Sequence, residues 1–141
     1  MKSIHLQLFS ICLFILLISS CKKEAGSGGT SFIKGKVYAK YYDKIFYAVK
    51  DSAYAPDVDV YIIYGDQSTY DDHQKTTYDG SYEFKYLRNG SYKIYAYSQD
   101  TTGHYSFQVN IYSPLLPVIK NVDITKKKQT VEVSDINVIL K

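Results

Sequence analysis

The sequence predicts an all-β protein, folded as a single Greek-key β-sandwich of about seven strands. Three observations lead to this prediction. Short runs of residues alternate between apolar and polar, turn-forming residues separate these runs, and no stretch has a helical period long enough to trust. Because successive side chains of a strand point to opposite faces, each run has one face suited to a core and one suited to solvent.

The clearest pattern lies in residues 77–96, where two alternating runs are joined by a short polar turn. Tyr82 and Phe84 alternate with polar residues in the first run, and Tyr92 and Ile94 do so in the second. Asn89-Gly90 between them tolerates the positive φ angles of a tight turn. We therefore predict strands over residues 81–87 and 91–98 that pair as a β-hairpin.

The remaining strands follow from the same alternation and from the breaks between runs. They are predicted at residues 32–40, 57–64, 73–78, 105–111, 118–125 and 130–140. Residues 113–117 are expected to break the chain, because their two prolines cannot donate to a central ladder. Residues 41–55 mix aromatic and charged side chains, and we favour an extended loop with some strand character. A longer first strand, a hairpin arm or a short helical turn are the alternatives for this segment.

Residues 1–20 have the features of a signal peptide and not of the fold. The apolar core of residues 6–18 is too short to span a bilayer, which takes roughly 20 apolar residues. The sequence Leu17-Ile18-Ser19-Ser20-Cys21 resembles the lipobox of bacterial lipoproteins. The resemblance implies cleavage before Cys21, a diacylglycerol on its sulfur and a fatty acid such as palmitate on its amine. The alternative is an ordinary secretory signal with a chance cysteine near its end.

The resemblance also predicts where the mature chain is found. Residues 21–31 are polar and Gly/Ser-rich, so we expect a flexible tether between the anchor and a sandwich domain at residues 32–141. Lipoproteins kept in the inner membrane often have Asp after the cysteine. Lys22 at that position favours the outer membrane, on its periplasmic or its surface side. Since Cys12 and Cys21 are the two cysteines of the chain, no disulfide is expected in the domain.

The domain resembles the carboxypeptidase regulatory-like group, whose fold is transthyretin-like and immunoglobulin-like, close to Cna-B domains. The likeness covers most of residues 32–140. The matching positions are Gly35-Lys36-Val37, Ala55-Pro56, Asp57 to Tyr61, Thr77, Asp79-Gly80, Tyr82, Phe84, Leu87, Gly90, Tyr92, Ile94 and the final strand. Asp57-Val58 departs from the usual Gly-Ala of this group. The resemblance implies a non-catalytic accessory module at the cell surface.

No motif for catalysis, cofactor binding or nucleotide binding is recognised in the sequence, so we expect a non-enzyme without a cofactor. The histidines His73 and His104 are too few for a zinc site. The aspartates around one loop form a weak calcium candidate, namely Asp66, Asp71, Asp72 and Asp79. A formal net charge of +3 is too small to indicate nucleic acid as a partner.

The 16 tyrosines suggest how the domain could bind a partner. Exposed aromatic rings can stack on sugars or form the centre of a protein interface. The candidate ligand-binding residues are Tyr41, Tyr42, Phe46, Tyr47, Tyr54 and Tyr61. We expect a structural or protein-interaction module of the envelope. The alternative function is glycan binding through the tyrosine-rich connection at residues 41–55, and rings that only cover the outer face of a sheet would have no binding role.

Overall fold

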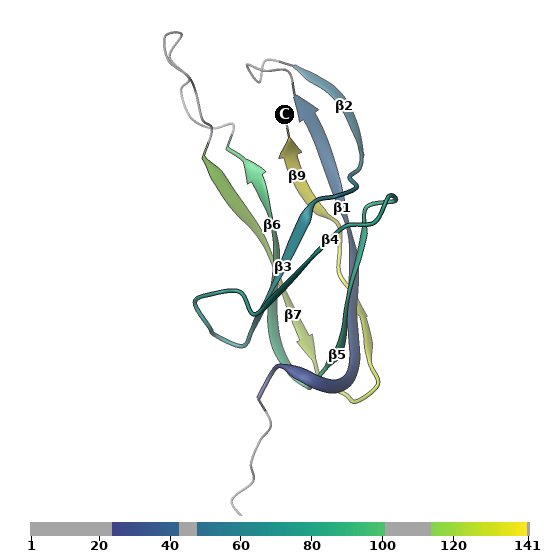
Figure 1. The fold of residues 1–141 in the computed structure, drawn as a ribbon, viewed down its shortest axis with the longest axis vertical. Coiled ribbons are helices and arrows are strands. Elements are labelled where there is room, and N and C mark those ends of the chain that lie inside the picture. The colour runs from purple at the N-terminus through teal and green to yellow at the C-terminus, as the bar shows by residue number, and fades with distance from the viewer. Residues whose placement is uncertain (1–23, 43–47, 101–113, 141) are drawn as a thin grey trace, which may run out of the picture.

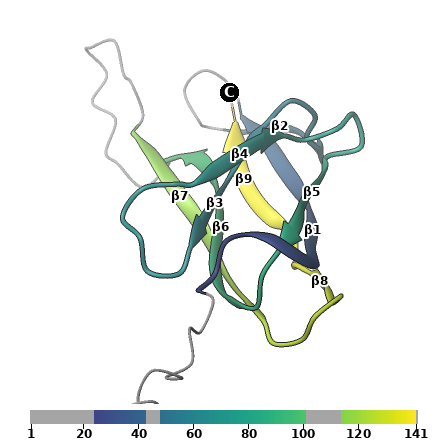
Figure 2. The ribbon, with the colours of Figure 1, turned by 60° about the horizontal axis from the view of Figure 1, so that its bottom comes forward.

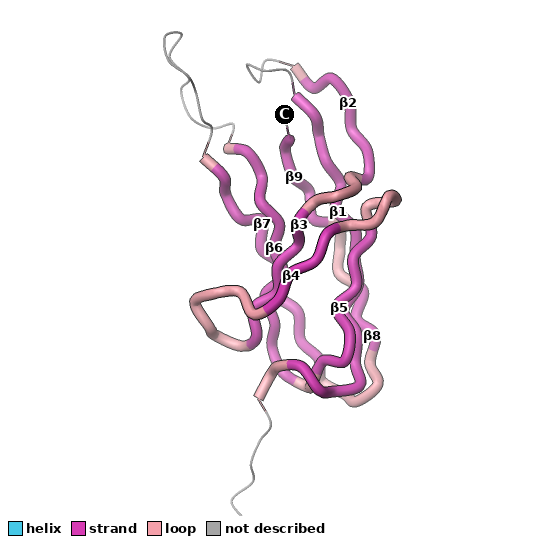
Figure 3. Tube along the Cα trace, viewed as in Figure 1, coloured by secondary structure: helices cyan, strands magenta, loops and turns pink. Residues whose placement is uncertain are grey.

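The computed structural model describes residues 24–42, 48–100 and 114–140, and in this part of the chain every regular element is a strand (Figure 1). The strands are β1 (Ser27–Tyr42), β2 (Val49–Tyr54), β3 (Asp59–Tyr64), β4 (Asp72–Lys75), β5 (Ser81–Leu87), β6 (Gly90–Gln99), β7 (Leu115–Ile124), β8 (Thr130–Glu132) and β9 (Ile136–Leu140). Figure 3 shows the described residues coloured as strands, loops and turns. No membrane-spanning helix occurs among the described residues.

The first sheet has five strands and is built on β1, which is 16 residues long. The first part of β1 lies between antiparallel β5 and parallel β8, with Ile33 opposite both Phe84 and Val131. The later part lies between antiparallel β2 and parallel β9. One long strand therefore connects four shorter ones, and its inward residues Ile33, Val37 and Ala39 are fully buried as their alternation predicts.

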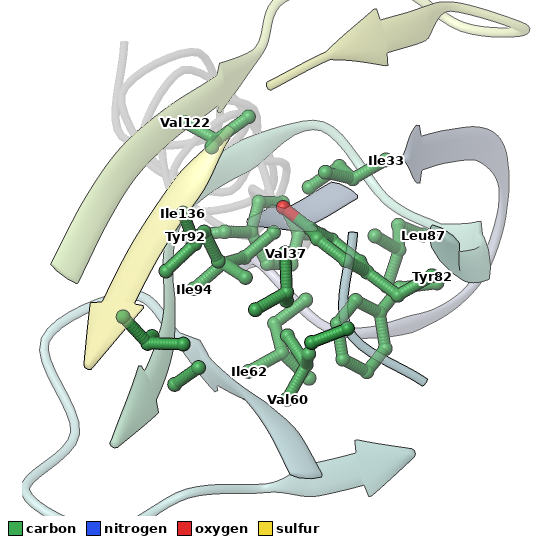
Figure 4. Packing of buried hydrophobic residues seen from close by; sticks show 14 of the residues in the cluster. Ile33, Val37, Val60, Ile62, Tyr82, Leu87, Tyr92, Ile94, Val122 and Ile136 are labelled. Carbon is green, nitrogen blue, oxygen red and sulfur yellow. The ribbon is translucent and has the colours of Figure 1, made fainter. Parts of the chain in front are cut away.

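The second sheet has four antiparallel strands in the order β4-β3-β6-β7. The strand β6 is central, with β3 on one side and all ten residues of β7 paired on the other. The two sheets face each other across one core, to which both contribute (Figure 4). The buried residues are Ile33, Val37, Ala39, Ala55, Val60, Ile62, Tyr82, Phe84, Leu87, Tyr92, Ile94, Ala96, Val122, Ile124, Ile136 and Val138. This arrangement confirms the predicted all-β sandwich.

The predicted β-hairpin at the centre of the sequence is wrong, although both of its strands form. β5 pairs with β1, whereas β6 pairs with β3 and β7 in the other sheet, so the chain crosses between the layers at Arg88 and Asn89. Tyr82 and Phe84 still meet Tyr92 and Ile94 in the core, from the opposite side. Alternation shows which residues of a strand face the core. The pattern is the same whether two successive strands pair as a hairpin or belong to different sheets, so it cannot distinguish the two arrangements.

Three other segments also differ from their predictions. β1 begins at Ser27, so the last five residues of the predicted tether are strand, and Ser31 is fully buried. Residues 49–54 form the hairpin arm β2, one of the alternatives for this segment, and not the favoured extended loop. β7 continues through Pro117, because this strand pairs only with β6 and an edge strand tolerates a missing donor.

The predicted last strand, at residues 130–140, is two strands separated by residues 133–135. The segment predicted as a strand at residues 105–111 lies outside the described residues, as does the signal peptide with Cys21. The described chain thus contains nine strands where about seven were predicted.

Candidate functional site

The outer face of the four-stranded sheet carries a cluster of aromatic side chains. It consists of Tyr61, Tyr70, His73, Tyr95 and Tyr97, and we call it the tyrosine surface. Strand alternation places it there: when the even-numbered residues of β3 and β6 face the core, the odd-numbered tyrosines face outward. Register then aligns three of the rings, because Tyr61 lies opposite both Tyr95 and His73.

Tyr61 is the centre of the tyrosine surface. Its ring stacks on that of Tyr95 with centroids 5.0 Å apart and planes 15° apart, and on that of His73 at 5.6 Å and 20°. Tyr70 and Tyr97 meet the Tyr61 ring edge-on, at 5.0 Å and 5.6 Å. Offset-stacked and edge-to-face pairs of this kind are each favourable by about 0.5–1.5 kcal/mol beyond the area they bury. The rings therefore hold one another in place.

The tyrosine surface has a buried floor and exposed members. Tyr95 is only 8% exposed, whereas Tyr97 is 38% and Tyr70 is 51% exposed. Burial, with a smaller contribution from a hydrogen bond to Tyr97, raises the pKa of Tyr95 to about 12. Burial also raises the pKa of Tyr61. These hydroxyls therefore stay neutral at ambient pH and are available as hydrogen-bonding groups.

Apolar side chains of β7 extend the tyrosine surface to the edge of the sheet. Ile119 lies directly opposite Tyr95 and is 49% exposed. Leu115, opposite Gln99 on the same face, is also exposed. Exposed aromatic and aliphatic groups thus continue across all four strands, which is the composition expected at the centre of an interaction surface.

The four described members of the six predicted ligand-binding residues are divided between the two sheets. Tyr41, Tyr42 and Tyr54 belong to β1 and β2 in the five-stranded sheet, while Tyr61 lies in the other sheet. Tyr54 packs edge-on against Tyr38, at 5.3 Å, and its hydroxyl donates to Asp135 Oδ2 at 3.1 Å. Phe46 and Tyr47 lie outside the described residues.

Two members of the tyrosine surface were missed in the sequence. Tyr70 and His73 lie in and beside the polar segment between β3 and β4, where no alternation of apolar residues points to a shared face. Only the register of β4 on β3 brings them to Tyr61. The outward tyrosines of β3 and β6 were predictable from alternation, but their partners from the loop were not.

The four aspartates of the weak calcium candidate are engaged separately. Asp66 lies 3.5 Å from Lys93, Asp71 Oδ2 accepts from Tyr64 N at 2.7 Å, and Asp72 Oδ1 accepts from His73 N at 2.8 Å. Asp79 accepts from Thr77, Ser81 and Lys36. Across the described residues, no three His, Cys, Asp or Glu side chains come together in a way that could hold a metal ion. The described structure therefore does not support this candidate.

A cleft of about 640 Å³ lies between the first part of β1, β5 and the end of β4. Its lining includes Lys34, Lys36, Lys75 and Lys85, and each of these forms an ion pair with a carboxylate. Because the positive charges are already neutralised by neighbours, the cleft offers no free cation to an anionic ligand. The tyrosine surface is the stronger candidate for a binding site.

Comparison with known proteins leaves the family open. No family model and no curated protein matches this chain. A solved structure of a candidate carbohydrate-binding protein from Pseudomonas aeruginosa is similar with a TM-score of 0.48 and 14% sequence identity, over 80% of this chain and 91% of that one.

Proposed function

We propose that the protein is a lipid-anchored, non-catalytic module of the cell envelope that binds a protein partner through the tyrosine surface. The observation that carries the proposal is the aromatic and aliphatic face of the four-stranded sheet, where Tyr70, Tyr97, Ile119 and Leu115 are exposed around the partly buried Tyr61. When a partner covers such a face, apolar surface is removed from water, and this stabilises the complex by about 25 cal/mol per Å² of apolar area buried.

The geometry of the rings favours a protein over a sugar. A sugar stacks on an open ring face, but both faces of Tyr61 are covered, by His73 and by Tyr95. The exposed groups around it are the tyrosines Tyr70 and Tyr97 together with the aliphatic Ile119 and Leu115. Tyrosine is among the residues that contribute most binding energy at the centres of protein interfaces. A flat sheet face of this composition suits a partner surface of similar shape.

Glycan binding is the second candidate function, and Tyr70 favours it. This ring is half exposed and lies beside His73, which can donate or accept a hydrogen bond to a sugar hydroxyl. On this hypothesis the sugar would contact Tyr70 and His73, and not the connection at residues 41–55 that the sequence suggests.

The anchor and the family remain parts of the proposal. The lipobox-like sequence ending at Cys21 supports acylation and a location in the envelope, with Lys22 favouring the outer membrane. Two or more acyl chains hold a protein firmly on a membrane, whereas one holds it marginally. The two-sheet fold and the burial of the motif residues Tyr82, Phe84 and Tyr92 support the resemblance to carboxypeptidase regulatory-like domains.

Site-specific photo-crosslinking in intact cells tests the binding face. A photoreactive phenylalanine analogue replaces Tyr70 or Tyr97 in the tyrosine surface. The matched controls are Tyr78 and Tyr86, which are 91% and 64% exposed elsewhere on the protein. We expect a discrete protein adduct from the first two positions and none from the controls. Equal adducts at all four positions, or adducts at none, would contradict the proposed protein interface. A diffuse adduct that is sensitive to glycosidase would support the glycan alternative.

A further inference from the structure

The point where the chain enters the sandwich is fixed to the fold only a few residues after Cys21. Gly26 N donates to Tyr92 Oη at 3.0 Å, and Gly26 O accepts from Arg88 N at 2.8 Å. Ala25 is partly buried against the core and close to Gly90. Among the described residues, Ala25 is the first that packs against the core, four positions beyond the proposed acylation site.

Four residues reach only a short distance. Even fully extended, they span about 14 Å, at 3.3–3.6 Å per residue. If Cys21 is acylated, this end of the sandwich has to lie close to the lipid headgroups. Figure 1 shows the described chain starting at one end of the molecule, with the C-terminal end of β9 at the other.

Basic residues gather at the end where the chain enters. The turn between β7 and β8 contains Lys126, Lys127 and Lys128, which are all exposed. Hydrogen bonds join this turn to the first part of β1, from Lys128 N to Thr30 Oγ1 at 3.1 Å and from Ser31 Oγ to Lys126 O at 3.1 Å. Figure 2 shows this turn beside the beginning of β1.

Arg88 lies at the same end, in the crossing between β5 and β6. The neighbouring Asn89 binds the β7–β8 turn, since its Nδ2 donates to Thr125 O at 3.0 Å. In the sequence, Lys22 and Lys23 precede the described residues.

Most lysines on the strands of the sandwich form ion pairs, and among the described residues Lys40, Lys50 and Lys120 are the exceptions. Lys34, Lys36, Lys75, Lys85 and Lys93 each form an ion pair with a carboxylate. Among the residues that the structure describes, Arg88 and the three lysines of the turn form no ion pair. The acidic residues Glu24 and Asp123 also lie at this end. The β3–β4 loop is joined to it from Gly65 N to Ser91 O at 2.8 Å, and its Asp66 forms an ion pair with Lys93.

We propose that this end, formed by Arg88, Lys126, Lys127 and Lys128, rests on anionic lipid headgroups and orients the sandwich on the membrane. The inference depends on the proposed anchor at Cys21 and extends it. Each Lys or Arg near an anionic membrane surface adds to the attraction, and the short connection keeps these residues within the range of that field. The tyrosine surface then faces sideways, clear of the bilayer.

Hydrogen exchange on the acylated full-length product in vesicles tests the inference. The vesicles contain phosphatidylcholine, either alone or mixed with phosphatidylglycerol. We expect amides of residues 86–90 and 125–129 to exchange several-fold more slowly with phosphatidylglycerol present, and this protection to fall in high salt. Lys126→Gln with Lys127→Gln is expected to abolish it. The matched control, Lys40→Gln with Lys50→Gln, removes the same charge from β1 and β2 and is expected to leave it unchanged.

The outcomes separate the inference from the anchor. Acylated protein whose exchange is the same in both kinds of vesicle would overturn the orientation and leave the anchor intact. The same would follow if the control variant lost the protection equally. Protein whose intact mass lacks acyl chains would overturn the anchor, and the proposed orientation with it.

Discussion

At the scale of single residues, two buried tyrosine hydroxyls differ in their partners. Tyr92 Oη accepts from Gly26 N at 3.0 Å and lies 2.6 Å from Arg88 O, to which it donates. Tyr82 Oη is buried and has no hydrogen-bond partner among the described residues, and burial raises the pKa of Tyr82. Removal of a paired buried hydroxyl leaves its partners unsatisfied, whereas removal of an unpaired one does not.

The comparison predicts opposite effects for one kind of substitution. Tyr92→Phe is expected to lower the free energy of unfolding by about 1–2 kcal/mol. Tyr82→Phe is expected to leave it unchanged or to raise it. Urea denaturation of the two variants beside wild type measures both. Equal destabilisation by the two substitutions would show that the hydrogen bonds of Tyr92 do not fix the beginning of the domain.

The ionisation of Asp79 makes the stability of the fold depend on pH. Its carboxylate accepts from Thr77 Oγ1 at 2.6 Å, from Ser81 Oγ at 2.8 Å and from Lys36 Nζ at 3.0 Å, and these hydrogen bonds lower its pKa. Because the pKa is lower in the folded than in the unfolded chain, ionised Asp79 stabilises the fold above the ordinary range near 4. That contribution is lost as the pH falls below this range.

We therefore expect the difference in stability between wild type and Asp79→Asn to shrink on acidification. The midpoints of urea denaturation of both proteins, at pH 7 and at about pH 3, measure this difference. At about pH 3 the carboxyl group of Asp79 in the unfolded chain is mostly protonated. A difference that stays constant between the two pH values would mean that the ionised form of Asp79 is not favoured by folding.

At the scale of elements, two glycines with positive φ separate backbone strain from lack of space. Gly80 has φ +76°, and a Cβ there would lie 2.9 Å from both Tyr54 Cβ and Val37 O. Gly65 has φ +63°, with nothing within 4 Å of the same position. Gly80 therefore allows the β4–β5 turn to pack closely against β1 and β2, while Gly65 only reverses the chain.

Alanine substitution distinguishes these two roles. Gly65→Ala is expected to cost about 1–2 kcal/mol for the left-handed backbone alone. Gly80→Ala has the same cost and displaces the β4–β5 turn as well, so its melting temperature is expected to fall further. Thermal unfolding of both variants measures the difference, and equal melting temperatures would contradict the close packing at Gly80.

The sequence allowed most strands to be predicted but not how they pair. Alternation located β5 and β6 to within a residue or two, because it reports which side chains face a core. It could not assign them to different sheets, since that depends on long-range register with β1 and β3. Only some members of the tyrosine surface could be predicted, for the same reason. Tyr61, Tyr95 and Tyr97 follow from alternation, while Tyr70 and His73 reach them only through the pairing of β3 with β4.

At the scale of the whole molecule, the proposed functions occupy different parts of the sandwich. The end where the chain enters carries unpaired basic residues next to the proposed anchor, and the outer face of the four-stranded sheet carries the tyrosine surface. A rigid two-sheet core connects the two. Such an arrangement would hold one face in a fixed direction from the membrane, which suits a module that supports or captures a partner in the envelope.

Acylation at Cys21 is the claim on which both the proposed function and the proposed orientation depend. Intact mass and membrane partition of the native protein, beside Cys21→Ser, test it most directly. The account predicts a wild-type mass that matches a chain beginning at Cys21 and carrying acyl groups, found in the outer membrane fraction. Cys21→Ser is predicted to lack this mass and to leave the membrane. If both proteins are unacylated and soluble, the anchor is contradicted and the domain is a secreted sandwich.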